Sequence, residues 1–222
     1  HAHDGTRKWL LDVGAGNAVE SVFIPEDDRG TLCISSQAGC AVNCRFCSTG
    51  HQGFSRNLTA GEIIGQLWFA EHLLRNDPEA VRRIEKYPTP GWEHTGRVIS
   101  NVVMMGMGEP LLNYDNVLKA IERISAEDGL FMSPRRITVS TAGVSKQIRK
   151  LGDDKVRFKL ALSLHAANDK KRSHIMEIND SNNLEELADA LRYFHQKTDA
   201  RITFEYIIFK DFNDKIEDAQ EL

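Results

Sequence analysis

No stretch of the 222-residue sequence is apolar over the length of about 20 residues that a transmembrane helix requires. The first residues also lack the basic and then apolar pattern of a secretory signal. We therefore expect a cytoplasmic protein without a membrane partner. The net charge of −4 gives no global positive field that would indicate a nucleic-acid ligand, and we interpret the local basic clusters at residues 135–136, 146–159 and 170–172 as solvated faces.

Cysteine is absent from residues 48–222, because all four cysteines lie between Cys33 and Cys47. A disulfide scaffold would distribute its cysteines so that they join distant segments. Their concentration in one short segment of a cytoplasmic chain instead indicates metal or redox chemistry. The chain is long enough to bury one sizeable core.

The spacing of apolar residues predicts an α/β fold. Residues 8–13 and 19–24 have the pattern of a β-hairpin around the turn at residues 14–17. Beyond residue 30, strand and helix patterns alternate five times, which predicts a parallel βα array. The expected strands are residues 31–35, 98–105, 136–140, 159–164 and 201–209, and the expected helices are residues 60–74, 113–124, 145–151, 184–197 and 216–222.

Five βα units of this kind form an incomplete, open barrel that follows a small N-terminal β-hairpin. The expected strands contain mainly apolar residues with little polar alternation, which predicts that both faces of the sheet are covered. Thr59 and Glu62 have the spacing of a capping box at the start of the first helix. We interpret residues 75–96, which contain three prolines, as a surface insertion.

The strongest chemical signal is the segment Gly39-Cys-Ala-Val-Asn-Cys-Arg-Phe-Cys47. Thiolates are the ligands that iron–sulfur clusters require. Because Cys40, Cys44 and Cys47 supply only three, one iron of a [4Fe-4S] cluster would remain open to a small molecule. A zinc site with His51 as the fourth ligand is the alternative.

Polar residues also follow three other expected strands. Glu109 lies in Gly106-Met-Gly-Glu-Pro110, where glycines permit close backbone approach and the carboxylate suits an ammonium group. Ser140 ends the next strand, and Ser163-Leu-His165 ends the one after it. Active sites of βα barrels gather at these carboxyl ends, although serines there are often turn formers and a histidine is often a core residue.

The cysteine spacing, with Phe46 in an aromatic position, resembles the cluster loop of radical S-adenosylmethionine (SAM) enzymes. In that superfamily the open iron is chelated by the amino and carboxylate groups of SAM, and an electron from the cluster cleaves SAM to a 5′-deoxyadenosyl radical. The resemblance implies a [4Fe-4S] cluster and SAM as cofactors and a partial TIM barrel of the (βα)6 type.

Longer segments resemble one family within that superfamily, the RlmN/Cfr methyltransferases. The similar segments are residues 4–9, 20–25, 31–37, 47–50, 106–113, 163–169 and 204–206. The resemblance implies methylation of adenine in large-subunit ribosomal RNA and in tRNA. The Pro-Leu-Leu-Asn after Glu109 favours modification at C2 over C8.

The family's functional positions can be carried over residue by residue. In the family, a cysteine near the C-terminus carries a methyl group that is transferred to adenine, and a second cysteine releases the product. The resemblance implies that Cys33 is this second cysteine and that Glu20 is the proton acceptor, although each also fits a structural role. It further implies that Cys40, Cys44 and Cys47 hold the cluster and that SAM is bound by Gly108, Glu109, Ser140, Ser163, Leu164 and His165.

The sequence departs from the family at one important point, because no cysteine follows Cys47. We therefore expect a fragment, with residues 1–30 as the remnant of an N-terminal domain and hairpin and residues 31–222 as a truncated radical SAM core. Without the methyl-carrying cysteine we expect no methyl transfer by this chain alone.

The expected partners are ribosomal RNA, tRNA and an electron donor such as flavodoxin, and the chain is expected to be a monomer. The alternatives are a C8 methyltransferase, another radical SAM enzyme, or a zinc-stabilised RNA-binding module without chemistry.

Overall fold

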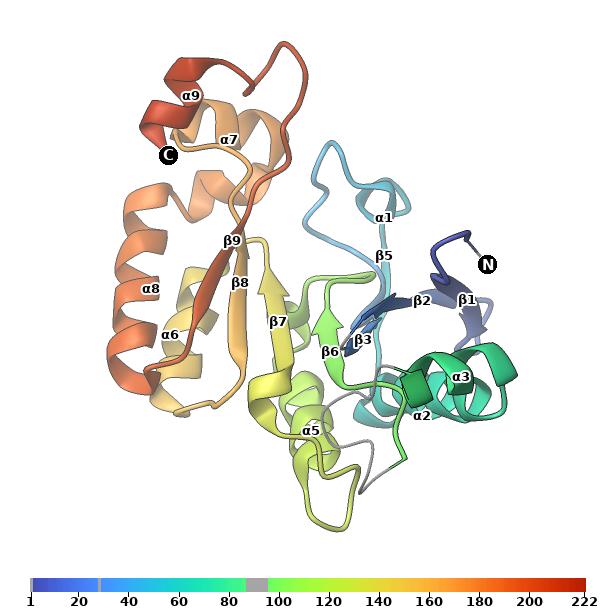
Figure 1. The fold of residues 1–222 in the computed structure, drawn as a ribbon. Coiled ribbons are helices and arrows are strands. Elements are labelled where there is room, and N and C mark those ends of the chain that lie inside the picture. Colours follow the sequence, from blue (N-terminus) through green and yellow to red (C-terminus); the bar gives the residue numbers. More distant parts are fainter. Residues whose placement is uncertain (1, 28, 87–95) are drawn as a thin grey trace.

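The computed structural model of the chain describes residues 2–27, 29–86 and 96–222 (Figure 1). Its centre is a seven-stranded sheet with the order β1-β2-β3-β6-β7-β8-β9, and a second sheet contains β4 and β5. The strands are β1 (Arg7–Asp12), β2 (Ala18–Glu26), β3 (Arg29–Cys33), β4 (Gln37–Gly39), β5 (Phe54–Asn57), β6 (Asn101–Met104), β7 (Ile137–Thr141), β8 (Lys159–Ser163) and β9 (Ile202–Glu205).

Helices follow most of the strands and complete the α/β fold that the sequence predicts. The α-helices are α1 (Ser48–His51), α2 (Ala60–Arg75), α3 (Pro78–Lys86), α5 (Tyr114–Ser125), α6 (Ser145–Asp153), α7 (Asp169–Ile175), α8 (Leu184–Thr198) and α9 (Ile216–Glu221). Short 3-10 turns occupy η1 (Pro110–Asn113), η2 (Pro134–Arg136) and η3 (Glu177–Ser181). None of the described helices is long and apolar enough to cross a bilayer.

The direction of the strands confirms the predicted architecture. The strands β3, β6, β7, β8 and β9 are parallel neighbours, and the hairpin β1–β2 joins this array because β2 pairs antiparallel with β3. Parallel neighbours end at the same edge of a sheet. The polar residues that follow β6 and those at the ends of β7 and β8 therefore gather at one end of a partial barrel.

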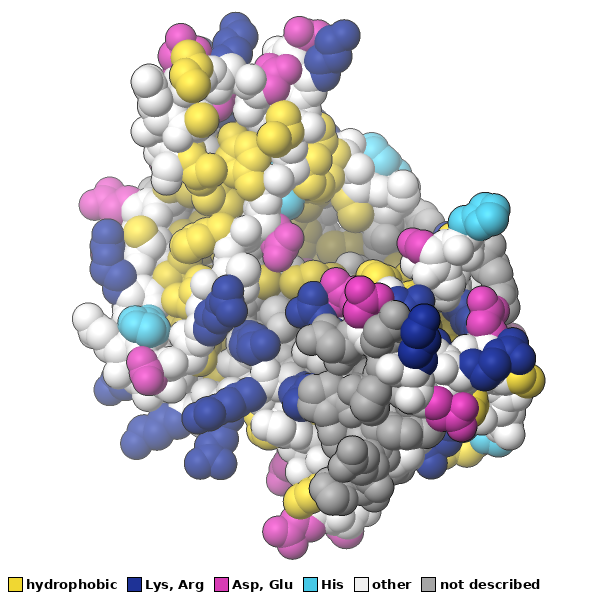
Figure 2. Space-filling model, viewed as in Figure 1, with side chains coloured by type: hydrophobic (Ala, Val, Ile, Leu, Met, Phe, Trp, Pro, Cys, Tyr) yellow, Lys and Arg dark blue, Asp and Glu magenta, His cyan; other side chains and the backbone are white. Residues whose placement is uncertain are grey.

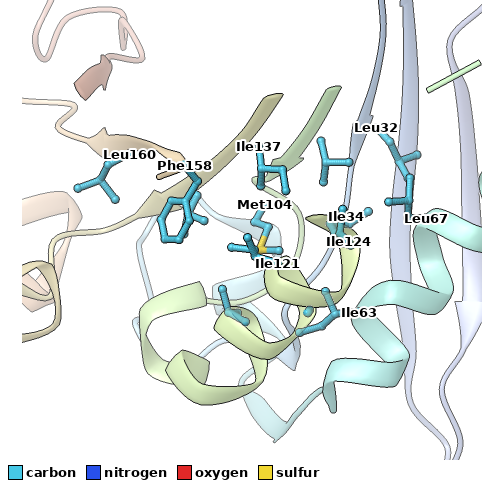
Figure 3. Packing of buried hydrophobic residues seen from close by; sticks show 14 of the residues in the cluster. Leu32, Ile34, Ile63, Leu67, Met104, Ile121, Ile124, Ile137, Phe158 and Leu160 are labelled. Carbon is cyan, nitrogen blue, oxygen red and sulfur yellow. The ribbon is translucent and has the colours of Figure 1, made fainter. Parts of the chain in front are cut away.

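The hydrophobic core lies between the sheet and its helices (Figure 3). In Figure 3, Leu32 of β3 lies beside Leu67 of α2, and Met104 of β6 points toward Ile121 of α5. Leu32 and Met104 are at most 1% exposed. Burial of apolar area on this scale is the main free-energy gain of folding, and it fixes the strand ends relative to one another.

The capping box at the start of α2 is confirmed. The Thr59 hydroxyl accepts a hydrogen bond from the Glu62 amide at 3.2 Å, and the Glu62 carboxylate accepts one from the Thr59 amide at 2.8 Å. Arg56 also binds this carboxylate and is the main reason why the pKa of Glu62 falls to about 2. The segment that leaves the cysteine loop is thereby fixed to the start of a core helix.

The structure corrects one expectation and adds two helices that were not expected. The sheet is not covered equally on both faces, because burial alternates along β6 and β7, and Thr138 and Ser140 lie on the half-buried face. Helix α3 occupies part of the expected insertion at residues 75–96, and residues 87–95 lie outside the described part of the chain. Helix α7 was not expected, because its seven residues contain only one large apolar side chain, Ile175.

Candidate functional site

A cavity of about 350 Å³ lies at the carboxyl ends of the parallel strands. Eight of the eleven expected site residues line it, namely Cys40, Cys44, Cys47, Gly108, Glu109, Ser140, Ser163 and His165. They come from the cysteine loop, from the loop after β6 and from the carboxyl ends of β7 and β8 with the residues directly after β8. We call this cavity the cysteine pocket.

The cysteine loop is closed at its base by the two-stranded sheet β4–β5. The Cys40 amide donates to the Gly53 carbonyl at 2.9 Å, and Gly39, at φ +78°, lies so close that a Cβ atom would approach the Gly53 oxygen to 1.9 Å. Only glycine fits there. Further along, the Arg45 amide donates to the Ile175 carbonyl at 3.0 Å, which attaches the loop to the end of α7.

The thiols of this loop are held in a partly buried environment. Burial raises the pKa of the Cys40 thiol, and it raises the pKa of the Cys44 thiol to about 12. The neighbouring thiols add to both shifts. Without a metal, both thiols are therefore protonated at neutral pH. Metal binding must displace these protons, so that assembly of a cluster is coupled to pH.

The donor set fits a cluster better than a single metal ion. A cubane attaches its protein sulfurs to separate iron atoms, whereas zinc draws all its ligands to one centre. Among the described residues, no three His, Cys, Asp or Glu side chains converge closely enough to hold one ion. The Nε2 atom of His51 lies 3.0 Å from the Arg45 carbonyl oxygen, so this nitrogen is engaged with the backbone.

The loop after β6 is joined to the segment that precedes the cysteines. The amides of Ser36 and Gln37 donate to the Met107 carbonyl at 2.8 and 3.1 Å, and the Ser35 hydroxyl accepts from the Met107 amide at 2.9 Å. At Gly108, with φ +99°, a Cβ atom would approach the Gln37 Cβ to 2.5 Å. The loop after β6 is thus in direct contact with the segment that precedes the cysteines.

Glu109 is buried at the wall of the pocket, with 3% of its surface exposed. Its carboxylate accepts hydrogen bonds from the Leu111 amide at 3.0 Å and from the Ala142 amide at 2.6 Å. Burial raises its pKa to about 6, although these hydrogen bonds act in the opposite direction. The side chain is therefore ionised at neutral pH and retains lone pairs for a cation in the pocket.

His165 is also buried, at a backbone φ of +59°. Burial, together with the charge of Arg172, lowers its pKa to about 4, so the imidazole is neutral at pH 7. Its Nδ1 atom accepts from the Ile207 amide at 3.1 Å, which leaves the proton on Nε2. The Phe46 ring meets the imidazole edge-on, with ring centres 5.0 Å apart.

Ser140 and Ser163 lie side by side on neighbouring strands. Their hydroxyl oxygens are 3.5 Å apart, and both line the cysteine pocket. The pair presents donors and acceptors to the same pocket as Glu109 and His165. Hydroxyl groups of this kind suit a sugar or a carboxylate.

Arg172 is a residue that the sequence analysis did not identify. It is fully buried and donates to the carbonyls of Ala142, Ser163 and Leu164 and to the Asn179 side chain. One guanidinium thus joins the ends of β7 and β8 beneath the pocket. The interpretation of residues 170–172 as a solvated cluster is wrong at Arg172, which shares a buried helix face with Ile175.

Three of the expected site residues do not line the pocket. Leu164 takes part in the sheet through its backbone, since its amide donates to the Glu205 carbonyl at 2.9 Å. Cys33 is a free thiol on β3, and burial raises its pKa to about 11. Glu20 is half exposed and forms an ion pair with Lys8 at 2.8 Å. Its neighbour Val22, two residues along β2, lies opposite Cys33 on β3. Because residues two apart in a strand share a face, Glu20 and Cys33 lie on the same face of the sheet.

Comparison with known proteins agrees with this geometry. The sequence profile of the Radical SAM superfamily matches residues 93–222. A crystal structure of a radical SAM methyltransferase from Sphaerobacter thermophilus matches the whole chain, cysteine loop included, with a TM-score of 0.88 and 38% sequence identity. The chain covers 60% of that protein.

Proposed function

The chain belongs to the radical SAM superfamily, and on that premise we propose that it forms the core of an RNA methyltransferase. The proposed reaction places a methyl group on C2 of an adenine in large-subunit ribosomal RNA and in tRNA. The observation that carries the proposal is the gathering of Cys40, Cys44, Cys47 and Glu109 around one cavity. The similarity to a methyltransferase of the same superfamily supports methyl transfer as the reaction class.

The cofactors that the superfamily implies fit the residues present. Cys40, Cys44 and Cys47 would hold three irons of a [4Fe-4S] cluster and leave the fourth open to SAM. When bound, the cluster supplies the electron that cleaves SAM. Because Glu109 is ionised above about pH 6, its carboxylate accepts hydrogen bonds from the ammonium group of SAM.

Other residues of the cysteine pocket would orient the rest of SAM. The neutral His165 offers its Nε2 proton as a hydrogen-bond donor, and Ser140 and Ser163 offer hydroxyl groups. These groups match the carboxylate and the ribose of SAM. Arg172 contributes indirectly, since it holds the strand ends on which both serines lie.

Two further residues have proposed roles in the later steps. Cys33 is the cysteine that releases the product by forming a disulfide with the methyl-carrying cysteine, and Glu20 is the proton acceptor. A thiol with a pKa of about 11 remains protonated at neutral pH, so Cys33 needs a base in order to react. The methyl-carrying cysteine is not among residues 1–222, and we therefore propose that these residues alone cleave SAM without methylating RNA.

Mass spectrometry of RNA treated with the full-length protein tests this function. We expect 2-methyladenosine in ribosomal RNA and tRNA, with flavodoxin or a chemical reductant as the electron source. Formation of 8-methyladenosine would overturn the C2 assignment and leave the superfamily assignment intact. SAM cleavage without any methylated RNA would overturn RNA as the substrate.

A further inference from the structure

A second cavity, of about 610 Å³, lies away from the cysteine pocket. It is lined by residues 133–135, 157–159 and 198–201, which directly precede β7, β8 and β9. Because parallel strands begin at the same edge, this cavity opens at the amino end of the partial barrel. Strands of five residues place it roughly 15–20 Å from the carboxyl ends where the cysteine pocket lies.

Four basic side chains line this second cavity, namely Arg135, Arg157, Lys159 and Arg201. Within the described part of the chain, none of these four side chains makes an ion pair or hydrogen bond. Figure 2 shows Lys and Arg side chains gathered at the end of the molecule where β8 and β9 begin. We call the cavity the basic cleft.

Acidic residues near the basic cleft do little to neutralise it. Asp199 is the single acidic residue in its lining. Asp154 accepts hydrogen bonds from Tyr114 and Lys150, and Asp153 accepts one from Tyr193. A chain with a net charge of −4 therefore concentrates unpaired positive charge at one end.

The arrangement suits an extended polyanion better than a small anion. A small anion is held by convergent, buried donors, whereas Arg135, Arg157 and Arg201 are exposed and come from three separate segments. Exposed cations gain affinity for a polyanion by releasing its condensed counterions, and this gain adds up over several contacts. The phosphodiester backbone of a nucleic acid is such a ligand.

We propose that the basic cleft binds the phosphodiester backbone of the RNA whose adenine enters the cysteine pocket. The proposal rests on the proposed function, from which it takes RNA as the substrate. A folded RNA is much longer than the strands of the barrel, so one molecule reaches both ends. The basic cleft would supply affinity without base specificity, because phosphate contacts carry no sequence information.

The test compares two double variants of equal charge. Arg157→Gln with Arg201→Gln removes two cations from the basic cleft, and Arg82→Gln with Lys119→Gln removes two exposed, unpaired cations from α3 and α5. The probe is an unmodified tRNA transcript, and its affinity is measured by fluorescence anisotropy over a range of salt concentrations. Arg157→Lys with Arg201→Lys keeps the charge and serves as the rescue variant.

We expect the glutamine variant of the basic cleft to bind the transcript about tenfold or more weakly at about 0.1 M salt. A plot of log affinity against log salt concentration has a negative slope, and in the glutamine variant this slope should be less steep by about 2. The α3/α5 variant and the lysine variant should keep the wild-type slope. An unchanged slope in the glutamine variant overturns the proposal. An equal loss in the α3/α5 variant also overturns it, because the effect would then be one of net charge alone.

SAM cleavage in the absence of RNA separates this proposal from the proposed function. All variants should cleave SAM at the wild-type rate, because none of the substituted residues lines the cysteine pocket. If the wild type cleaves SAM but does not bind the transcript, both the basic cleft and RNA as the substrate are wrong. If the wild type binds the transcript but does not cleave SAM, the proposed chemistry fails while the basic cleft stands.

Discussion

Glu109 combines a structural and a chemical role in one buried carboxylate. Its hydrogen bonds with the Leu111 and Ala142 amides connect the loop after β6 to the end of β7. The same burial that makes these bonds strong also raises its pKa to about 6, close to physiological pH. The charge at this position is therefore sensitive to modest acidification.

This sensitivity predicts the pH dependence of SAM binding. Above the raised pKa of about 6 the carboxylate is ionised and binds the ammonium group of SAM, and below it the proton competes with the ammonium group. We expect the affinity of the cluster-loaded protein for SAM to fall as the pH decreases from about 7 to about 5.

The matched variant is Glu109→Gln, which is close in shape but carries no charge. It should bind SAM roughly tenfold or more weakly at neutral pH, since hydrogen bonds to charged groups contribute about 1.5–3 kcal/mol. Its affinity should no longer vary over this pH range. Titration calorimetry of both proteins checks this, and a variant with the same pH profile as the wild type would refute the role of Glu109.

Substitution of the buried Arg172 should lower the free energy of unfolding strongly. In Arg172→Met, the Asn179 side chain and the backbone carbonyls of β7 and β8 lose their buried donor. Each unsatisfied buried group costs about 1–3 kcal/mol, so we expect a loss of roughly 3 kcal/mol or more. Urea unfolding measures this loss, with the exposed Lys170→Met as the control, which should change stability by less than about 0.5 kcal/mol. Equal stability of the two variants would contradict this account of Arg172.

Individual residues of the pocket were predictable where the chemistry requires a particular side chain. Thiols at a cluster spacing and a glutamate directly after a Gly-Met-Gly segment at a strand end have few alternative explanations. Arg172 was missed because its two basic neighbours, Lys170 and Lys171, give the segment the composition of a solvated face. Its burial follows from helix phase and from four hydrogen-bond acceptors that lie outside helix α7, and the fold alone brings these acceptors around the guanidinium.

Among the elements, the cysteine loop depends on the small sheet β4–β5 at its base. This sheet was not expected, because its strands have three and four residues and are too short for a periodic pattern. The longer elements were predictable, since α5 carries a clear apolar periodicity and α2 has a capping box. Their ends differ by a few residues, because strand ends are set by pairing with neighbours rather than by local preference.

A single methyl group added at Gly39 should disrupt the base of the cysteine loop. In Gly39→Ala, the new Cβ atom would approach the Gly53 carbonyl oxygen to 1.9 Å at a φ of +78°, so β4 and β5 cannot keep their pairing. We expect lower iron binding after anaerobic reconstitution and a lower unfolding midpoint.

A glycine on α2 supplies the control for this change. Gly65 has open space around its Cα atom, so Gly65→Ala should keep the iron and stabilise the helix by up to about 1 kcal/mol. Full iron binding by Gly39→Ala would show that the loop does not need this base.

On the scale of the whole molecule, the two cavities lie at opposite ends of the parallel strands. The cysteine pocket lies at the carboxyl ends of the parallel strands, and the basic cleft lies at their amino ends. The fold class and the position of the cysteine pocket follow from the alternation of strands and helices, because this alternation dictates which ends meet. The basic cleft was not predictable, since its cations lie in three segments that the sequence analysis interpreted as solvated or did not single out.

Cluster binding should stabilise the whole fold. A ligand that binds the folded state alone raises its stability by mass action, and the cysteine loop contacts β5, α7 and the segment after β6. We expect removal of iron by a chelator to lower the thermal midpoint. Cluster assembly should also become more favourable with rising pH, because the thiols of Cys40 and Cys44 have raised pKa values and must lose their protons. A midpoint that does not change with iron would contradict this coupling.

The iron and acid-labile sulfide content of the anaerobically reconstituted protein tests the central claim most directly. We predict about four irons per chain and a broad absorption near ~400 nm in the wild type and in Cys33→Ala. The variants Cys40→Ala, Cys44→Ala and Cys47→Ala should each lose the cluster. A colourless protein with one zinc, or a loss of iron in Cys33→Ala equal to that in the other three variants, would contradict the account.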